Sequence, residues 1–343
     1  MKCPVCGEDC VQAAHELIAL EPTVFAPCPD CKGRTLDKQA PLPDQTYASP
    51  CSCGKRFIDE VYAHMYVIMV EEGVLRPTEP LIRVGTPLVH PGFAMVRPPY
   101  LPARSLVLLS RIVTEPCAQR IFSEVPEVRG VIRSSDAVPG LSDIDFDGIP
   151  DTYELLAGCD VRANIFTTQN EKIVIYKQQS TIHIEFPRGF DPKIIEVGSR
   201  VRHVKPRMFV DACSGAGTLG IVAGLYDIPH VVLNDAWYAA AFWSAYNLMV
   251  NRENLNFEEL KMFFTYEEMK TRPVVKDVLK IAETRGGSQY FEVYQGDCRQ
   301  LHTVLPDHVD LTVIDLFEKK EQEKVQAVID NWKAHVSGEV FIP

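Results

Sequence analysis

The most informative segment of the sequence is Arg207-Met-Phe-Val-Asp-Ala-Cys-Ser-Gly-Ala-Gly-Thr-Leu-Gly-Ile-Val-Ala223. Its apolar residues 208–210 predict a strand, which ends in an acid and turns through two glycines into a helical pattern. Glycine lets a backbone approach a ligand closely, and the start of a helix follows at once. This pattern predicts an α/β fold, a doubly wound parallel sheet, with a cofactor at the turn. The candidate cofactor-binding residues are Asp211, Ser214, Gly215, Ala216 and Gly217.

Two further strand patterns end in polar residues. Residues 231–233 are followed by an Asn-Asp pair about twenty residues beyond the turn, where a carboxylate binds ribose hydroxyls in sheets of this kind. Residues 290–294 lead into Gly-Asp-Cys, and an acid there can accept a hydrogen bond from an adenine amino group. The carboxyl ends of parallel strands line one crevice. These strand ends therefore add Asn234, Asp235, Asp297 and Cys298 to the candidate cofactor site.

A fourth strand pattern, residues 310–314, ends at Asp315-Leu-Phe-Glu318. Together the four strand ends resemble class I S-adenosylmethionine-dependent methyltransferases. The glycines of residues 215–220 also match the G-x-G-x-x-G pattern of dinucleotide-binding domains, so NAD is a competing cofactor. The acids at 211, 297 and 315 favour the methyltransferase. The resemblance implies methyl transfer, for which Asp315 and Glu318 are the candidate catalytic residues, as a base or as substrate-binding groups.

A narrower resemblance follows from the order of the segments upstream. Glu154-Leu-Leu-Ala-Gly158 precedes Phe186-Pro-Arg188 and then the glycine turn. This order is similar to that of the archaeal and eukaryotic tRNA guanine-N1 methyltransferases and their wybutosine-pathway relatives, over roughly residues 100–317. The resemblance implies an RNA acceptor. However, Asp315-Leu-Phe-Glu318 stands where that family has Asn-x-Pro, which leaves open a protein side chain or metabolite as acceptor, or a non-catalytic scaffold that binds partner proteins.

The catalytic sheet is expected to be short. A fifth strand over residues 338–343 ends the sequence, so the usual sixth and seventh strands are expected to be missing. An insertion over residues 252–288 has a helical pattern at 257–265 and 274–284. We expect it to cover the cofactor or to dock a partner.

Seven of the eleven cysteines precede residue 54 and lie at the spacing of metal-binding knuckles. The pairs at 28/31 and 51/53 resemble a zinc ribbon, since two thiolate pairs complete one tetrahedral site. Cys10 and His15 are candidates to complete a second site. An iron–sulfur cluster is the alternative, because iron also takes four thiolates. The candidate metal ligands are Cys3, Cys6, Cys28, Cys31, Cys51 and Cys53.

The middle of the chain predicts a small α+β subdomain and an acidic loop. A helix over 58–75 and a proline-rich connector lead to strands at 104–113 and Val128–Arg133, with a helix at Glu115–Glu124 between them. Residues Asp143–Glu154 match the spacing of a calcium-binding loop. We therefore expect a cysteine module (1–65), a connector and small subdomain (66–160), and a catalytic domain (161–343).

The overall charge limits the choice of partners. The formal net charge is −11, which argues against a protein that grips nucleic acid by bulk electrostatics. The cysteine module is acidic as well, so it is as suited to docking a partner protein as to binding RNA. The sequence has no apolar run long enough to span a membrane and no signal peptide. Free, knuckle-spaced cysteines indicate a reducing compartment, so we expect a cytoplasmic protein.

Overall fold

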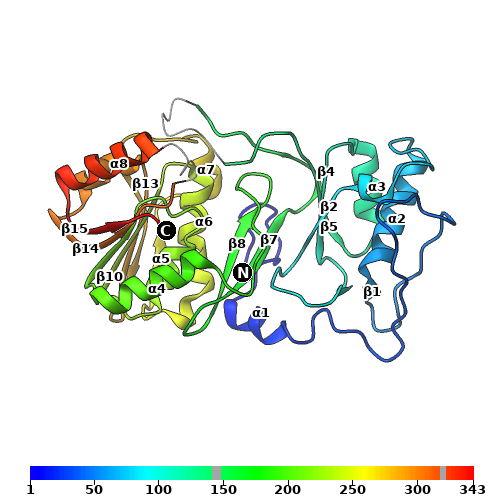
Figure 1. Cartoon of the computed structure of the whole chain (residues 1–343), viewed down its shortest axis with the longest axis horizontal. Coiled ribbons are helices and arrows are strands. Elements are labelled where there is room, and N and C mark those ends of the chain that lie inside the picture. Colours follow the sequence, from blue (N-terminus) through cyan, green and yellow to red (C-terminus); the bar gives the residue numbers. More distant parts are fainter. Residues whose placement is uncertain (141–147, 317–321) are drawn as a thin grey trace.

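The computed structural model describes residues 1–140, 148–316 and 322–343. Three parts follow one another along its longest axis (Figure 1): a large sheet with helices, a two-stranded hairpin, and a small sheet with two helices. No helix in the described part of the chain is long and apolar enough to span a membrane.

The large sheet has the strand order β11-β12-β13-β10-β9-β14-β15. The five strands from β13 to β15 in this order are parallel. The chain builds outward from β9 to β10 and β13, then crosses over to β14 and β15. A crevice therefore opens beside the carboxyl end of β9, where the direction of building reverses. These strands are β9 (Met208–Asp211), β10 (His230–Asp235), β13 (Tyr290–Gln295), β14 (His308–Val313) and β15 (Ser337–Phe341).

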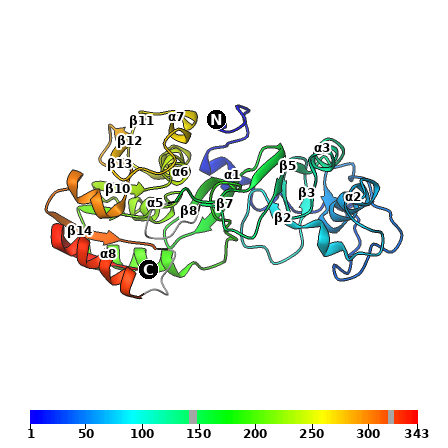
Figure 2. The ribbon, with the colours of Figure 1, turned by 90° about the horizontal axis from the view of Figure 1, so that it is seen from above.

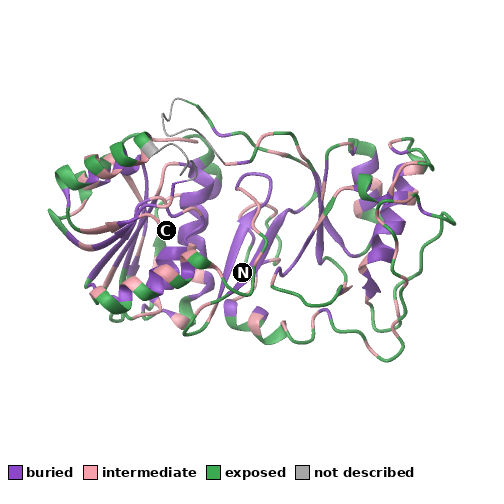
Figure 3. Cartoon of the chain, in the orientation of Figure 1, coloured by how far each residue is buried: buried purple, intermediate pink, exposed green. Residues whose placement is uncertain are grey.

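Helices cover both faces of this sheet, so the predicted doubly wound α/β fold is confirmed. Neighbouring residues of β9 serve the two faces, because Phe209 belongs to one apolar core and Val210 to another. Figure 3 shows the strands buried between the two layers. One layer holds α4 (Pro192–Val204), α5 (Thr218–Gly224) and α6 (Tyr238–Val250), and the other holds α8 (Gln322–His335) and the 3₁₀ helix η3 (Cys298–Val304).

The insertion before β13 extends the sheet. The prediction of helices over 257–265 and 274–284 is therefore wrong. An antiparallel hairpin pairs with the edge of β13 instead. The periodicity of apolar residues alone could not distinguish a helical insertion from a hairpin. The hairpin is favoured because its pairing with β13 satisfies backbone groups that would otherwise line a sheet edge. The insertion contains η2 (Arg252–Asn254), β11 (Glu259–Met262), α7 (Tyr266–Lys270) and β12 (Leu279–Arg285). Among the described residues, β15 borders the opposite side of the sheet.

The small α+β subdomain forms as the sequence predicts, with the strand–helix–strand unit confirmed at α3 (Glu115–Glu124) and β5 (Val128–Arg133). Its four-stranded sheet has the order β2-β4-β5-β6 and packs against α2 and α3. The other elements are β1 (Arg56–Phe57), α2 (Ile58–Glu71), η1 (Leu81–Val84), β2 (Thr86–Val89), β3 (Tyr100–Leu101), β4 (Leu106–Ser110) and β6 (Glu154–Gly158).

A hairpin of β7 (Val161–Thr167) and β8 (Lys172–Gln178) lies between the two sheets and packs on α6. Two amides of α6 pair with β8 as a neighbouring strand would. Asn247 accepts from the Tyr176 N–H at 2.8 Å and donates to its carbonyl at 2.9 Å, and Asn251 does the same with Val174 at 2.9 and 2.7 Å. The hairpin is thereby fixed against the large sheet.

The N-terminal cysteine segments join two different cores. The helix α1 (Ala14–Leu20) lies beside β8 (Figure 2), and Cys3 and Leu17 share the core of the hairpin. Phe25 and Leu42 instead belong to the core of the small subdomain. The segment over residues 1–42 thus bridges the two halves of the chain.

Candidate active site and cysteine clusters

The glycine turn between β9 and α5 leaves an open stretch of backbone at the crevice. Gly215 and Gly217 have φ values of +53° and +89°, which glycine adopts without strain. A Cβ built on Gly215 would meet nothing within 4 Å, so its backbone faces open space. The Ser244 hydroxyl of α6 donates to the Gly215 carbonyl at 2.9 Å and lies 2.9 Å from the Ser214 hydroxyl. The turn is therefore held by α6 and can receive a ligand on its open side.

Two carboxyl groups fix this turn from the strand ends. The Asp211 Oδ2 atom accepts from the Gly220 N–H at 2.9 Å, at the start of α5. The Asp235 Oδ2 atom accepts from the Gly215 N–H at 2.9 Å, and its Oδ1 atom accepts from the Trp237 N–H at 2.9 Å. Each carboxylate oxygen has a second lone pair. Asp235 can therefore also accept hydrogen bonds from ribose hydroxyls beside the open turn.

Three other predicted cofactor residues lie near the carboxyl ends of β10 and β13. Asn234 is fully buried, and its amide donates to the Ala212 carbonyl at 3.0 Å and the Gly296 carbonyl at 2.9 Å. Asp297 caps η3 and forms an ion pair with Arg299 at 2.7 Å. Cys298 is buried. These contacts hold neighbouring loops together, and the binding of an adenine amino group by Asp297 stays a prediction.

A pocket extends from the turn toward α4 and β14. It is lined by Ala216 and by Asp315, the predicted catalytic residue after β14. The Asp315 Oδ2 atom lies 2.6 Å from the Lys193 ammonium nitrogen, at the start of α4. The second predicted catalytic residue, Glu318, lies outside the described residues.

The electrostatics of the crevice discriminate between the two candidate cofactors. Burial raises the pKa of Asp211 well above its ordinary value, and the nearby Asp315 raises it further. Burial also raises the pKa of Asp235 to about 6. A pyrophosphate group would bring more negative charge to three strand-end carboxyls, and the Gly220 N–H at the helix start is already occupied. A sulfonium carries positive charge, so this donor set fits S-adenosylmethionine better than NAD.

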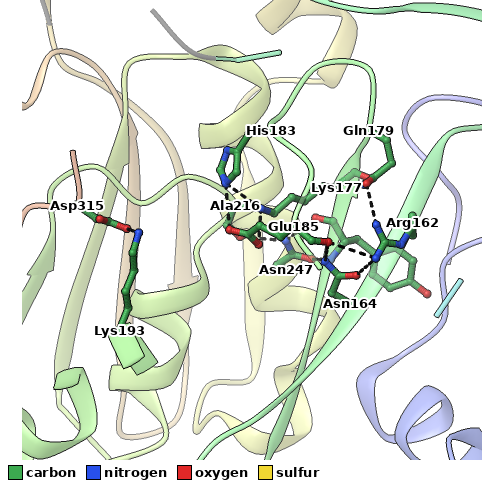
Figure 4. A network of polar contacts seen from close by, with 11 residues as sticks. Arg162, Asn164, Lys177, Gln179, His183, Glu185, Lys193, Ala216, Asn247 and Asp315 are labelled. Carbon is green, nitrogen blue, oxygen red and sulfur yellow. Dashed lines mark hydrogen bonds and ion pairs between the residues drawn. The ribbon is translucent and has the colours of Figure 1, made fainter. Parts of the chain in front are cut away.

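On the far side of the pocket lies a polar cluster that sequence reasoning missed (Figure 4). The Lys177 ammonium lies 2.6 Å from Glu185 Oε2, and His183 Nε2 lies 3.0 Å from Glu185 Oε1. Burial lowers the pKa of Lys177, and burial followed by the Lys177 charge lowers that of His183. Although burial acts the other way, Lys177 and His183 hold the pKa of Glu185 below its ordinary value. The cluster therefore keeps a carboxylate ionised beside a proton-transfer group.

A buried network of hydrogen bonds holds this cluster in place. The Arg162 guanidinium donates to Asn164 Oδ1 at 2.5 Å and Gln179 Oε1 at 3.1 Å, and Asn164 donates to the Glu185 carbonyl at 3.2 Å. Residues 181–185 form a loop that this network holds in place. The Asn247 amide also donates to the Ala216 carbonyl at 3.0 Å, which links the glycine turn to β8. No motif marks these residues, because they meet only through the packing of the hairpin on α6.

The calcium prediction finds no support. Residues 141–147, which supply its first three carboxylates, lie outside the described residues. Of the others, Asp151 is exposed, and Glu154 lies in β6, where it forms an ion pair with Arg133.

The predicted cysteines gather into two clusters, each with four sulfur atoms within 4.8 Å of one another. The second cluster joins Cys28, Cys31, Cys51 and Cys53, as predicted, with sulfur separations of 3.5 and 3.6 Å. A tetrahedral ion with metal–sulfur bonds of about 2.3 Å needs sulfur separations of about 3.8 Å. A multi-iron cluster would hold its thiolates further apart, since each binds a different iron. Both clusters can therefore hold a single tetrahedral ion.

The first cluster differs from the predicted set in one ligand. It joins Cys3, Cys6 and Cys10 to Cys159 rather than to His15. The His15 Nδ1 atom instead lies 2.8 Å from Glu253. A ligand about 150 residues away leaves no signal in local spacing.

No family model matches the chain, and no curated protein matches its sequence. Similar solved structures include Trm1 from Pyrococcus horikoshii with S-adenosyl-L-methionine (18% identity, TM-score 0.36), with 52% of this chain and 42% of that chain covered. Another is P. horikoshii TYW2 in complex with MeSAdo (16% identity, TM-score 0.35, 77% and 74% covered). A third is Trm5b from Pyrococcus abyssi (13%, 0.34, 68% and 56%). The match spans less than half of the Trm1 chain.

Proposed function

We propose that this chain is an S-adenosylmethionine-dependent methyltransferase. The observation that carries the proposal is the open Gly215 backbone flanked by Asp211, Asp235 and Asp315 at the carboxyl ends of three parallel strands. When bound, S-adenosylmethionine supplies an electrophilic methyl group on a sulfonium. Asp235 would accept the ribose hydroxyls, and Asp211 would hold the start of α5 in place beside the cofactor through the Gly220 N–H.

The pocket offers groups for the acceptor as well. Lys193 orients the Asp315 carboxylate toward the same pocket that Lys177, His183 and Glu185 line. Methyl transfer mainly needs the acceptor held in line, with a base where the acceptor loses a proton. We assign Asp315 to acceptor binding and the Glu185–His183 pair to removing a proton.

The acceptor that we favour is an RNA base. The loop between Glu185 and Asp191, both at the pocket, presents Phe186 at 60% and Phe190 at 80% exposure, with an exposed Arg188 between them. Exposed aromatic and arginine side chains stack on unpaired bases. The loop therefore suits a single-stranded RNA segment better than an aliphatic side chain.

The proposal includes a bound zinc ion and a cytoplasmic location. The cluster of Cys28, Cys31, Cys51 and Cys53 would bind one zinc ion, which holds the loop before α2 in place. Thiols at this spacing stay reduced in the cytoplasm, where an RNA-modifying enzyme would act.

The proposal is tested by label transfer from S-adenosyl-[methyl-³H]methionine to separate RNA, protein and metabolite fractions. We expect label in the RNA fraction. Replacing Phe186 or Phe190 by alanine should lower kcat/KM by about 5- to 100-fold, since stacking contributes about 1–3 kcal/mol per base. The control is Phe263→Ala, which removes a ring that is 37% exposed and lies elsewhere on the surface. Label in another fraction would overturn the RNA acceptor alone, whereas calorimetric binding of NAD in place of both S-adenosylmethionine and S-adenosylhomocysteine would overturn the methyltransferase.

Cofactor affinity should depend on pH through Asp235. Its carboxyl must be ionised to accept two hydroxyls, and its pKa is about 6. We expect the Kd for S-adenosylhomocysteine to be about tenfold higher at pH 5 than at pH 8, and the dependence to vanish in Asp235→Asn. This raised pKa stabilises the fold as the pH falls from about 6 toward 4, because the native state then binds the proton more tightly than the unfolded chain. A flat calorimetric profile between pH 8 and 5 would contradict the role of Asp235.

A further inference from the structure

The first cysteine cluster lies at the junction between the two halves of the chain. Cys159 occupies the short link between β6 of the small sheet and β7 of the hairpin, and it is 9% exposed. The sulfur atoms of Cys3 and Cys10 each lie 3.9 Å from that of Cys159, and Cys6 lies 3.5 Å from Cys10. These separations match the edges of one tetrahedral tetrathiolate site. An ion there would join the N-terminus to the interdomain link.

A buried cation stands next to this cluster. Arg129 of β5 is 6% exposed, and its backbone carbonyl accepts from the Cys159 N–H at 2.8 Å. Its buried Nε–H has no hydrogen-bond partner, and we find no ion pair to its guanidinium within the described residues. Burial of an unpaired charge is costly, so such a group indicates a missing partner.

The missing partner follows from the charge of the cluster. Four thiolates around one divalent ion carry a net charge of −2. Arg129, Cys6, Cys10 and Cys159 line the same cavity of about 600 Å³, so the guanidinium lies beside the place where that charge would form. Partners around a metal site commonly tune its affinity without binding the metal.

We propose that Cys3, Cys6, Cys10 and Cys159 bind one zinc ion as a tetrathiolate, and that Arg129 is a positioning residue that balances its charge. The site clamps the N-terminal segment onto the β6–β7 link. The next residue, Asp160, is fully buried and accepts from the Ser180 N–H at 2.7 Å. Ser180 lies at the start of the loop that carries His183 and Glu185, so the clamp also supports that side of the pocket.

The first test counts metal sites in the whole purified chain. Titration of the metal-free protein with Co²⁺ should give two equivalents with the intense thiolate-to-cobalt absorption of tetrahedral sites. Cys159→Ser should retain one equivalent, and Cys159→His, which restores a ligand, should recover the second with a weaker absorption. Cobalt binding by Cys159→Ser that equals binding by the unaltered chain would overturn the clamp, and this outcome is independent of methyl transfer.

The second test isolates Arg129. Chelator competition should show that Arg129→Gln weakens zinc at one site by about 10- to 100-fold and leaves the Cys28/Cys31/Cys51/Cys53 site unchanged. The matched control is Arg104→Gln, since Arg104 lines the same cavity but donates to the Phe122 and Val128 carbonyls. The variant should also narrow the difference in Tm between zinc-loaded and chelated protein, because it removes an unpaired charge from the metal-free state. Equal zinc affinity in Arg129→Gln and the unaltered chain would overturn the role of Arg129.

Discussion

Glu127→Ala is expected to lower the free energy of unfolding of the small subdomain by about 3–5 kcal/mol, because it leaves a buried guanidinium without its partner. Arg56 and Glu127 are 3% and 1% exposed, and Arg56 Nε donates to Glu127 Oε1 at 3.0 Å. The pair anchors β1, directly after the second cysteine cluster, to the small sheet. Arg56 also lies 3.2 Å from His64 Nδ1, and burial together with the Arg56 charge lowers the pKa of His64 to about 4. The histidine is therefore neutral at pH 7 and adds no second positive charge beside Arg56.

The measurement is urea unfolding followed by far-UV circular dichroism. The matched control is Glu154→Ala, which breaks the ion pair with Arg133 on the same sheet, where the side chains are 58% and 43% exposed. An exposed pair contributes about 0–1 kcal/mol. The double variant Arg56→Met with Glu127→Leu should regain most of the stability, since it removes both charges. Equal losses in Glu127→Ala and Glu154→Ala would show that the buried pair is not the anchor.

Asp235→Ala is expected to weaken S-adenosylmethionine and S-adenosylhomocysteine binding by at least about 100-fold. The variant removes the acceptor for the ribose hydroxyls, and hydrogen bonds to a charged group contribute about 1.5–3 kcal/mol each. It also frees the N–H groups of Gly215 and Trp237, so the turn loses its fixed backbone. Isothermal titration calorimetry measures both affinities directly.

The same sheet offers a matched control at the opposite end of β9. Asp310 also accepts from two backbone N–H groups, those of Arg207 and Met208, at 2.8 and 2.9 Å. These contacts lie at the start of β9, away from the glycine turn. Asp310→Ala should therefore destabilise the sheet to a similar degree while the Kd stays within about twofold. Similar losses of affinity in both variants would mean that Asp235 acts only through stability.

The parts of the fold that could be predicted are those in which a short segment determines its own structure. Apolar periodicity and turn residues occur within a few positions in the glycine turn, at the strand-end acids and in the unit of α3 and β5. The insertion before β13 could not be predicted, because β12 forms by pairing with a strand that the helical pattern does not reveal. Tertiary pairing overrides weak local preference in such segments.

The site divides in the same way. Asp211 and Asp235 are the last residues of β9 and β10, so position in the sequence predicted that they lie at the carboxyl ends of these strands. Lys177 belongs to a hairpin whose placement depends on two asparagines of α6, some 70 residues later, and the loop after this hairpin carries His183 and Glu185. Cys159 lacks any neighbouring cysteine, and nothing short of the three-dimensional arrangement joins it to Cys3, Cys6 and Cys10.

The distance along the chain between Cys10 and Cys159 also determines when the first cluster can be completed during synthesis. These cysteines are 149 residues apart, and ribosomes add about 5–20 residues per second, so the first cluster waits roughly 7–30 s for its fourth thiol. Cys28 and Cys51 are 23 residues apart, and the second cluster can close within about 1–5 s. On the nascent chain, therefore, three N-terminal thiols remain open to oxidation or to the wrong metal until the small subdomain has emerged.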